Sequence, residues 1–314
     1  MTFTLLPENH ASIFSPLLYR FEGEGEPRTL TVEVRDALLN CTIHRKAFYH
    51  TTSGEIDIAP LLRHYLSPDP NPSTSGFVDE PLQRWLRVAV AVEGASVTRT
   101  FLPLEMPLRY APILGSLPSK RRIALGECDE ITLMGRYSKV LLELSTPEGM
   151  RQEELEAPAV EEELRLFRLD TSHFPKDATN FRLTFYLGTD LLCSVDYEVV
   201  PRELQGARLA WIDRRGALQH YTFPWCEAYK EVQERASSSY YRTLLLKSDY
   251  EPSLVREALL EIGTARFCWL LTPRGEYLPV KPTLQPVEGC NLDDIFPLTF
   301  LIHLTPKDLL QWNS

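Results

Sequence analysis

The sequence predicts a mainly β protein made of three consecutive small antiparallel β-sandwich or barrel-like domains with few short helices. Many short stretches rich in Val, Leu, Tyr, Phe and Thr alternate apolar and polar residues with period two, the pattern of a half-buried strand. Turn residues separate these stretches at intervals of roughly 8 to 15 residues, and no helix lies between successive strands to favour a parallel sheet.

Six stretches carry the alternation most clearly, and each is expected to form a strand. Their side chains change face at every residue, so one face of each strand can pack on a core while the other meets water. The expected strands are 28–34, 84–93, 138–144, 181–187, 194–200 and 297–304.

Helical patterns are few, and the best one lies near 252–262. Pro252 suits a first helical position, and Gly263 follows as a stop. A second, shorter helix is expected within 58–66, again with a proline near its start. The longer helix should turn one apolar stripe to the core, formed by Leu254, Val255, Ala258, Leu259 and Ile262.

Proline-rich passages suggest how the 314 residues divide into domains. The passage 102–118 separates two strand-rich regions, and a further boundary is expected near 201–207. The polar passage 66–81 is expected to be a long mobile loop within the first domain, because a strand pattern resumes after it. The predicted domains are 1–105, 106–204 and 205–314, the last with the helix near 252–262.

Three turns between strand-like stretches share one chemical form. They are TPEG (Thr146 to Gly149), DRRG (Asp213 to Gly216) and TPRG (Thr272 to Gly275). A proline at the second position presets φ, and the final glycine can adopt the left-handed conformation. In DRRG an aspartate at the first position can bond the backbone instead. The predicted structural turn residues are Pro147, Gly149, Asp213, Gly216, Pro273 and Gly275.

Composition and charge exclude several function classes. A net charge of −10 and a pI near 5.3 disfavour a nucleic-acid partner, and the basic run Ser119 to Arg122 is interpreted as a solvated strand start. No apolar run approaches the ~20 residues that span a bilayer, so membrane insertion is not expected and synthesis in the cytoplasm is. The six cysteines are scattered without a C-x-x-C pair, and reduced, non-catalytic thiols are expected.

The common motifs for catalysis, cofactors and metals do not occur in the sequence. G-x-S-x-G and the phosphate-cradling glycine loops are both missing from it. A strand would place Cys41 and His44 on opposite faces, so convergence with His50 on a metal requires a bulge. We therefore predict no catalytic, cofactor or metal residue. Acids and neighbouring polar residues that could in principle serve hydrolysis, but form no recognisable motif, are Asp57, Asp170, Ser172, His173, Asp190, Asp293 and Asp294.

The stretch ARLAWIDRRGALQHYTFP, 207–224, holds an acid, two arginines and a histidine within one predicted hairpin. Alternation places Leu209 and Trp211 on one face and His220 on the face of Leu218. A diagonal contact from Asp213 to His220 is conceivable, but we favour a hairpin role for both over a catalytic dyad.

The third region resembles the closing region of uncharacterised prophage and phage proteins that are similar to tail or baseplate structural components. An aromatic strand, a glycine turn and Y-T-F precede a strand of the form v-w-l…g-e-y-l-P-V; a weaker echo lies in GEIDIAPLLRHYL of the first region. The resemblance implies assembly rather than catalysis and transfers no catalytic residue. Its matching residues are Trp211, Gly216, Tyr221, Phe223, Trp269, Gly275, Tyr277, Pro279 and Val280.

The function expected from these observations is a non-enzymatic structural or interaction protein of a phage or prophage tail. Its partners would be protein subunits of a larger assembly, copies of the same chain among them, and its final place a virion or tail-like particle. The alternative is a carbohydrate-binding or adhesion module that presents Trp85, Trp225 or Trp312 to a glycan. A hydrolase site assembled from distant residues is a third hypothesis, to be judged by a pocket with convergent acids or histidines.

Overall fold

The computed structural model shows a mainly β protein, as the sequence predicts. The described residues form six small sheets, antiparallel except for two parallel pairings, and two α-helices. Each of the six expected strands coincides with an observed strand to within a few residues. The structure describes residues 1–72, 74–78, 80, 82–106, 108, 111–158, 164–201, 206–231, 241–272, 274–286 and 296–304.

The chain divides into two compact units, and the division does not follow the sequence continuously. The first unit consists of Met1–Asp69 and Glu80–Arg109, with the short segment Arg214–Gly216. The second consists of Pro70–Asp79, Tyr110–Asp213 and Ala217–Ser314. The chain therefore passes between the units several times.

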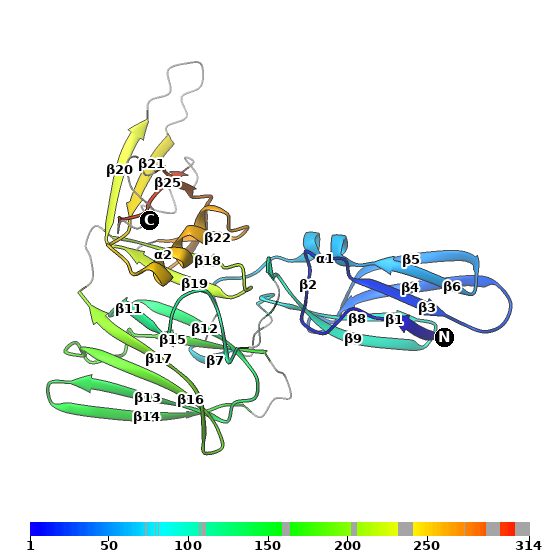
Figure 1. Cartoon of the computed structure of the whole chain (residues 1–314), viewed down its shortest axis with the longest axis horizontal. Coiled ribbons are helices and arrows are strands. Elements are labelled where there is room, and N and C mark those ends of the chain that lie inside the picture. Colours follow the sequence, from blue (N-terminus) through cyan, green and yellow to red (C-terminus); the bar gives the residue numbers. More distant parts are fainter. Residues whose placement is uncertain are drawn as a thin grey trace. The chain divides into compact units, whose positions relative to one another are not determined.

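Two sheets make up the first unit (Figure 1), and aromatic side chains pack between them. Phe21 of one sheet meets Phe48 of the other edge to face, with ring centroids 5.4 Å apart. The three-stranded sheet has the order β1 (Thr2–Leu5), β3 (Leu18–Glu22) and β6 (Ser53–Asp57). The five-stranded sheet has the order β2 (Ala11–Ser12), β9 (Ala95–Leu102), β8 (Leu86–Val92), β4 (Arg28–Asp36) and β5 (Cys41–Thr51).

A short helix, α1 (Ala59–Tyr65), follows β6 where the sequence predicted it. Its first turn contains Pro60, whose missing N–H would be unpaired there in any case. The carboxylate of Asp57 accepts hydrogen bonds from the backbone N–H of Ala59 and of Leu17, both at 2.9 Å. Asp57 thus anchors the start of this helix.

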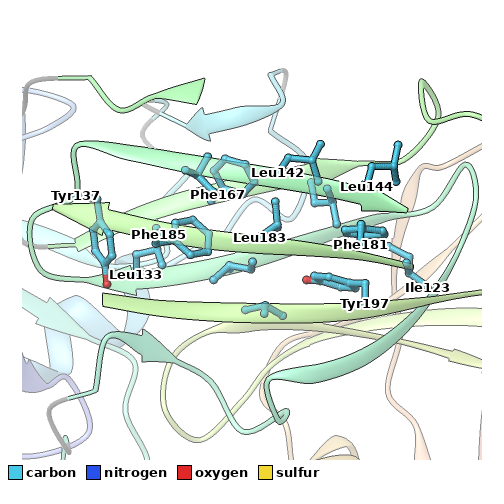
Figure 2. Packing of buried hydrophobic residues seen from close by; sticks show 14 of the residues in the cluster. Ile123, Leu133, Tyr137, Leu142, Leu144, Phe167, Phe181, Leu183, Phe185 and Tyr197 are labelled. Atoms are coloured by element: carbon cyan, nitrogen blue, oxygen red, sulfur yellow. The ribbon is translucent and has the colours of Figure 1, made fainter. Parts of the chain in front are cut away.

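Two sheets in the second unit enclose an aromatic core (Figure 2). Phe185 and Phe167 meet edge to face at 5.5 Å, while Phe181 stacks on Tyr197 at 4.6 Å. The first sheet has the order β10 (Ile113–Leu114), β12 (Cys128–Met134), β15 (Leu164–Asp170) and β7 (Gly76–Val78). The second has the order β11 (Lys120–Ala124), β17 (Asp190–Val200), β16 (Asn180–Leu187), β13 (Lys139–Thr146) and β14 (Gly149–Glu156).

The passage 66–81 differs from the loop that the sequence led us to expect inside the first domain. Gly76–Val78 forms strand β7, which pairs antiparallel with Leu166–Arg168 of β15 in the second unit. The physical reason is the burial of apolar side chains: Phe77 packs edge to face on Phe167, with ring centroids 5.3 Å apart, and Val78 is buried. Three residues were too short for a period-two pattern to announce them.

Two further four-stranded sheets complete the second unit around a core that contains Trp211, Phe223 and Phe300. One has the order β19 (Leu218–Phe223), β18 (Ala207–Ile212), β22 (Cys268–Leu271) and β23 (Tyr277–Pro279). The other has the order β20 (Trp225–Glu231), β21 (Tyr241–Lys247), β25 (Thr299–Leu304) and β24 (Thr283–Leu284). The β18 strand is buried on both faces, with Leu209 and Trp211 on one and Ala210 and Ile212 on the other, as alternation predicted.

The longer predicted helix is α2 (Ser253–Leu260), continued by a 3-10 turn over Glu261–Gly263. Ala258, Leu259 and Ile262 are buried, which confirms most of the apolar stripe. Leu254 is wrong as a core residue, because 63% of it is exposed. It lies at the margin of the stripe, one residue before Val255, and so projects to the side of the buried residues of the helix.

The three predicted glycine turns have the backbone that the prediction requires. Gly149, Gly216 and Gly275 have φ of +131°, +80° and +83°. Asp213 accepts a hydrogen bond from the N–H of Ala217 at 3.0 Å, within the turn that joins β18 to β19. Pro147 lies in the two-residue connection between β13 and β14, and Pro273 lies outside the described residues.

Candidate functional site

In the second unit, buried charged and polar side chains form a hydrogen-bonded network centred on Asp129 of β12. One carboxylate oxygen accepts hydrogen bonds from Arg121 at 2.8 Å and from the Tyr197 hydroxyl at 2.7 Å. The other lies 3.2 Å from Nδ1 of His220 and 2.9 Å from the backbone N–H of Glu130. All the partners that Asp129 needs are therefore supplied inside the protein.

A chain of hydrogen bonds leads from His220 through Tyr277 and Arg168 to Cys128. Nε2 of His220 lies 2.9 Å from the Tyr277 hydroxyl, which also accepts a hydrogen bond from Arg168 at 3.0 Å. Arg168 donates a second bond to the Cys128 thiol at 2.9 Å. The chain thus joins side chains from β19, β23, β15 and β12.

Arg208 of β18 forms the third arm of the network. Its guanidinium donates to Glu127 at 3.0 Å, to the Thr222 hydroxyl at 2.6 Å and to the Cys128 carbonyl at 2.6 Å. The Arg208 and Glu127 side chains are only 8% and 11% exposed. This ion pair fixes β18 against the loop that precedes β12.

The charges of the network balance one another. Burial by itself raises the pKa of Asp129, but the charges of Arg121 and Arg208 and the His220 hydrogen bond hold it well below its ordinary value. Burial lowers the pKa of His220 to about 3, so its imidazole is neutral at neutral pH. Three carboxylates then face three guanidinium groups: Glu127, Asp129 and Glu130 with Arg121, Arg168 and Arg208.

The protonation states fix the direction of each hydrogen bond at His220. An ionised Asp129 can only accept, so Nδ1 of the neutral imidazole donates to it. Nε2 then accepts the proton of the Tyr277 hydroxyl. Both ring nitrogens are occupied and the side chain has no exposed surface. The two hydrogen bonds link β19 to β12 and to β23 and so stabilise the packing of these strands.

A cleft of about 580 Å³ opens onto this network and is lined by Arg121, Glu127 and His220 of the network together with Glu198, Asp249 and Glu251. The strongest pairing in it joins Arg122 of β11 to Glu251 and to Asp249, the latter at 3.0 Å. The Tyr221 hydroxyl also donates to Glu251, at 2.6 Å. Backbone and arginine hydrogen bonds lower the pKa of Asp249, so this group holds no proton to deliver as a general acid at neutral pH.

The aspartate and histidine of the hairpin at 207–224 do not pair with one another. Asp213 bonds the N–H of Ala217 and, through its second oxygen, the N–H of Ser116 at 2.6 Å. His220 bonds Asp129, which lies ninety-one residues away in the sequence. The hydrogen bond to Ala217 agrees with the interpretation of Asp213 as a turn residue, but its carboxylate is buried and not exposed at the surface.

The remaining residues considered for hydrolysis have local roles. The Asp170 carboxylate accepts the N–H of Ser172 at 2.9 Å, and His173 is exposed in the same turn. Asp190 begins β17 at an exposed position. Asp293 and Asp294 lie outside the described residues.

Cys41 and His44, the possible metal ligands, do not lie on opposite faces of the sheet as alternation predicts. A bulge in the β4–β5 pairing brings Cys41 opposite Asp36 and His44 opposite Val34, so the two lie on one side of the sheet after all. Cys41 is engaged by the Tyr65 hydroxyl at 3.1 Å. Within the described ranges no group of three or more His, Cys, Asp or Glu side chains is placed to hold a metal ion.

Five of the six cysteines fall within the described residues, and each is a free thiol. Burial raises the pKa of Cys193 to about 11, so its thiolate is disfavoured at neutral pH. Cys290 lies outside the described residues. Across the same described stretches no helix is long and apolar enough to cross a bilayer.

The basic run Ser119 to Arg122 begins strand β11, but the expectation that it is solvated is wrong for Arg121. Its side chain is 6% exposed because it is paired with Asp129. Sequence reasoning missed the network itself. Two signals were present: acids inside the apolar run CDEITLM, and Arg208 inside ARLAWI, since buried charges in a strand require partners.

The three tryptophans proposed to bind a glycan differ in their exposure. Trp225 is 42% exposed, and the Lys247 ammonium lies 5.7 Å from its ring centroid. Trp85 is half-buried, and Trp312 lies outside the described residues.

Long edge strands are the more extensive candidate surface. Within the described residues, β5 pairs only with β4, and β14 pairs only with β13, so each ends a five-stranded sheet. Almost every residue of β14 is exposed. A strand at a sheet edge presents unpaired backbone N–H and C=O groups, which another strand can bind.

Comparison with known proteins identifies no family for this chain. No family model and no curated protein matches the chain. Among solved structures, trypsin-activated alpha-2-macroglobulin from Escherichia coli is similar over 78% of this chain, with 9% identity and a TM-score of 0.20. The match covers 19% of the length of that protein.

Proposed function

We propose that this protein is a non-enzymatic assembly subunit that binds other protein subunits through exposed sheet edges. The observation that carries the proposal is the pair of long edge strands, β5 and β14, each the last strand of a five-stranded sheet. Strand addition at such an edge gains main-chain hydrogen bonds along its whole length. The resemblance of 207–304 to prophage tail- and baseplate-associated proteins agrees with an assembly role.

The buried network supports the same proposal from another direction. Its titratable groups are paired with one another, and its histidine is neutral and enclosed, so its contribution is to hold the sheets of the second unit in fixed positions. A second unit held in a fixed conformation presents β14 in a defined geometry, which suits a subunit that must join neighbours.

The test is co-purification from the native cell with the products of neighbouring genes, followed by measurement of the mass of the complex. We expect a stoichiometric complex, either with copies of the same chain or with a second subunit. A protein that stays monomeric at every concentration and captures no product of its own gene cluster would contradict the proposal.

Exposed Trp225 favours one second candidate, a glycan-binding module. Its ring is 42% exposed on β20, and aromatic faces of this kind bind sugars. A glycan array with wild type and Trp225→Ala separates the two proposals. Binding that Trp225→Ala removes supports a glycan ligand, whereas an array without hits rejects it.

A further inference from the structure

We propose that copies of this chain join head to tail, with strand β14 of one copy added antiparallel to strand β5 of the next. The inference rests on the proposed assembly function and names its partner: a second copy of the chain. Three observations support this inference. The two edges carry opposite net charge, each has an exposed apolar side chain, and one register places the opposite charges and the apolar side chains opposite one another.

The two edges carry opposite charge. Strand β5 contains Arg45 and Lys46 and no acid, so its formal charge is +2. Strand β14 contains Arg151 against Glu153, Glu154 and Glu156, so its formal charge is −2. Pairing β14 with a second β14, or β5 with a second β5, would bring together two strands of the same net charge, which is unfavourable. Charges on edge strands commonly prevent indiscriminate pairing, and here they leave the mixed pairing open.

One antiparallel register aligns the features of both strands. Placing Lys46 opposite Glu153 also places Arg45 opposite Glu154. In the same register Tyr49 meets Met150, and these are among the most exposed large apolar side chains, at 73% and 64%. The full set of pairs is His44 with Leu155, Arg45 with Glu154, Lys46 with Glu153, Ala47 with Gln152, Phe48 with Arg151, and Tyr49 with Met150.

The faces of the strands agree with this register. Lys46 and Phe48 pair with Val32 and Leu30 of β4, whose side chains point into the core of the first unit. Glu153 and Arg151 pair with Leu142 and Leu144 of β13, which belong to the core of the second unit. In a continuous sheet the core-side residues of both strands would therefore share one face. Arg45 and Glu154 would share the other.

The contact is heterologous, because β5 and β14 are different surfaces of the chain. Each copy that uses one edge leaves its other edge free for the next copy. Such a contact yields a ring if the rotation closes and a filament if it does not. Assembly should therefore grow with protein concentration rather than stop at a dimer.

Charge reversal at the central pair provides the test. No ion pair in the described chain involves Lys46 or Glu153, so the contact that the reversals Lys46→Glu and Glu153→Lys remove within one copy is that of the Lys46 ammonium with the Phe48 ring, 4.7 Å from its centroid. We expect sedimentation of the full-length chain to show concentration-dependent assemblies for wild type. Each single variant should raise the dissociation constant at least about tenfold, because like charges then oppose one another.

Mixing the two variants gives the decisive result. In an equimolar mixture, each β5 strand that carries Lys46→Glu can meet a β14 strand that carries Glu153→Lys. The remaining contacts join an unchanged β5 to an unchanged β14, so assembly should return to the wild-type level. The controls are the reversals Lys176→Glu and Glu26→Lys at exposed positions away from both edges. Reversals that leave assembly unchanged, or a mixture no better than either variant alone, would overturn the inference.

Disulfide trapping tests the register itself. Ala47→Cys on one chain and Gln152→Cys on another should form an intermolecular disulfide on mild oxidation, since directly opposite Cα atoms lie about 4.5–5.5 Å apart, within the range that a disulfide spans. Ala47→Cys mixed with Met150→Cys, displaced by two residues, is the matched control. Equal trapping of both pairs would refute the register.

The outcomes also separate this inference from the proposed function. Assemblies that persist through every reversal overturn the β5–β14 contact and leave an assembly role through another surface. A wild-type chain that is monomeric at all concentrations overturns the inference, and the proposed function then depends on a partner found by co-purification.

Discussion

Lowering the pH from 7 to 5 should destabilise this protein through His220, a residue with no exposed side-chain surface. Burial lowers its pKa in the folded chain to about 3, while an unfolded histidine has a pKa of about 6.5. Between these values the unfolded chain binds a proton that the folded chain does not. A group with a depressed folded pKa stabilises the fold above the unfolded value, and that stability is lost as the pH falls.

The magnitude follows from the proton uptake of the unfolded chain alone, because folded His220 stays neutral down to pH 5. Over the interval from pH 7 to pH 5 the free energy of unfolding should fall by about 2 kcal/mol on this account. The substitution His220→Asn keeps an amide donor near the position of Nδ1 but cannot titrate. The stability difference between wild type and this variant should therefore shrink by about 2 kcal/mol.

Denaturant unfolding at pH 7, 6 and 5, followed by tryptophan fluorescence, measures this difference. Trp211 and Trp269 are both buried in the sheet that contains His220. The exposed His173, replaced by Gln, controls for the loss of one histidine. A stability difference between wild type and His220→Asn that stays constant within about 0.5 kcal/mol across the series would refute the reasoning.

Two further predictions concern backbone conformation and core packing. Gly216→Val should cost about 1–2 kcal/mol, because φ is +80° and a Cβ would lie 3.3 Å from Cδ of Pro103. A melting temperature equal to wild type would show that the turn does not require this conformation; Gly216→Asn is the milder control. Phe185→Ala should cost about 3–5 kcal/mol, since the ring is fully buried against Phe167. Phe185→Leu should cost clearly less by the same chemical denaturation, and equal losses would contradict the cavity argument.

Period-two alternation predicted the fold class well because it reports a property of single strands. Each stretch such as 28–34 or 181–187 has to bury one face, whatever its partner is. The glycine turns were predictable for the same reason, since the positive φ of Gly216 is a local requirement. Pairing between distant strands is not local, and so the short strand β7 was missed.

The buried network could not be assembled from the sequence because its members are far apart along the chain. Asp129 meets His220 across ninety-one residues, and Arg208 meets Glu127 across eighty-one. A bulge reversed the expected faces of Cys41 and His44, and no local pattern announces a bulge. Neither β5 nor β14 is among the six strands that the sequence predicts, and only the sheet order reveals that both lie at edges.

Strand β7 also has a consequence for how the chain is made and divided. Its partner β15 begins eighty-eight positions after Gly76, at Leu164, so Gly76–Val78 must wait for that stretch to be synthesised before its ladder can form. A fragment that ends at residue 105 would contain β7 without its partner strand β15. The second unit would then lose the edge-to-face contact between Phe77 and Phe167. Cutting the gene between the strand-rich regions therefore damages both pieces. The segment Pro70–Asp79 belongs to the second unit but lies in the sequence between two segments of the first, so the two units do not correspond to separate stretches of the chain.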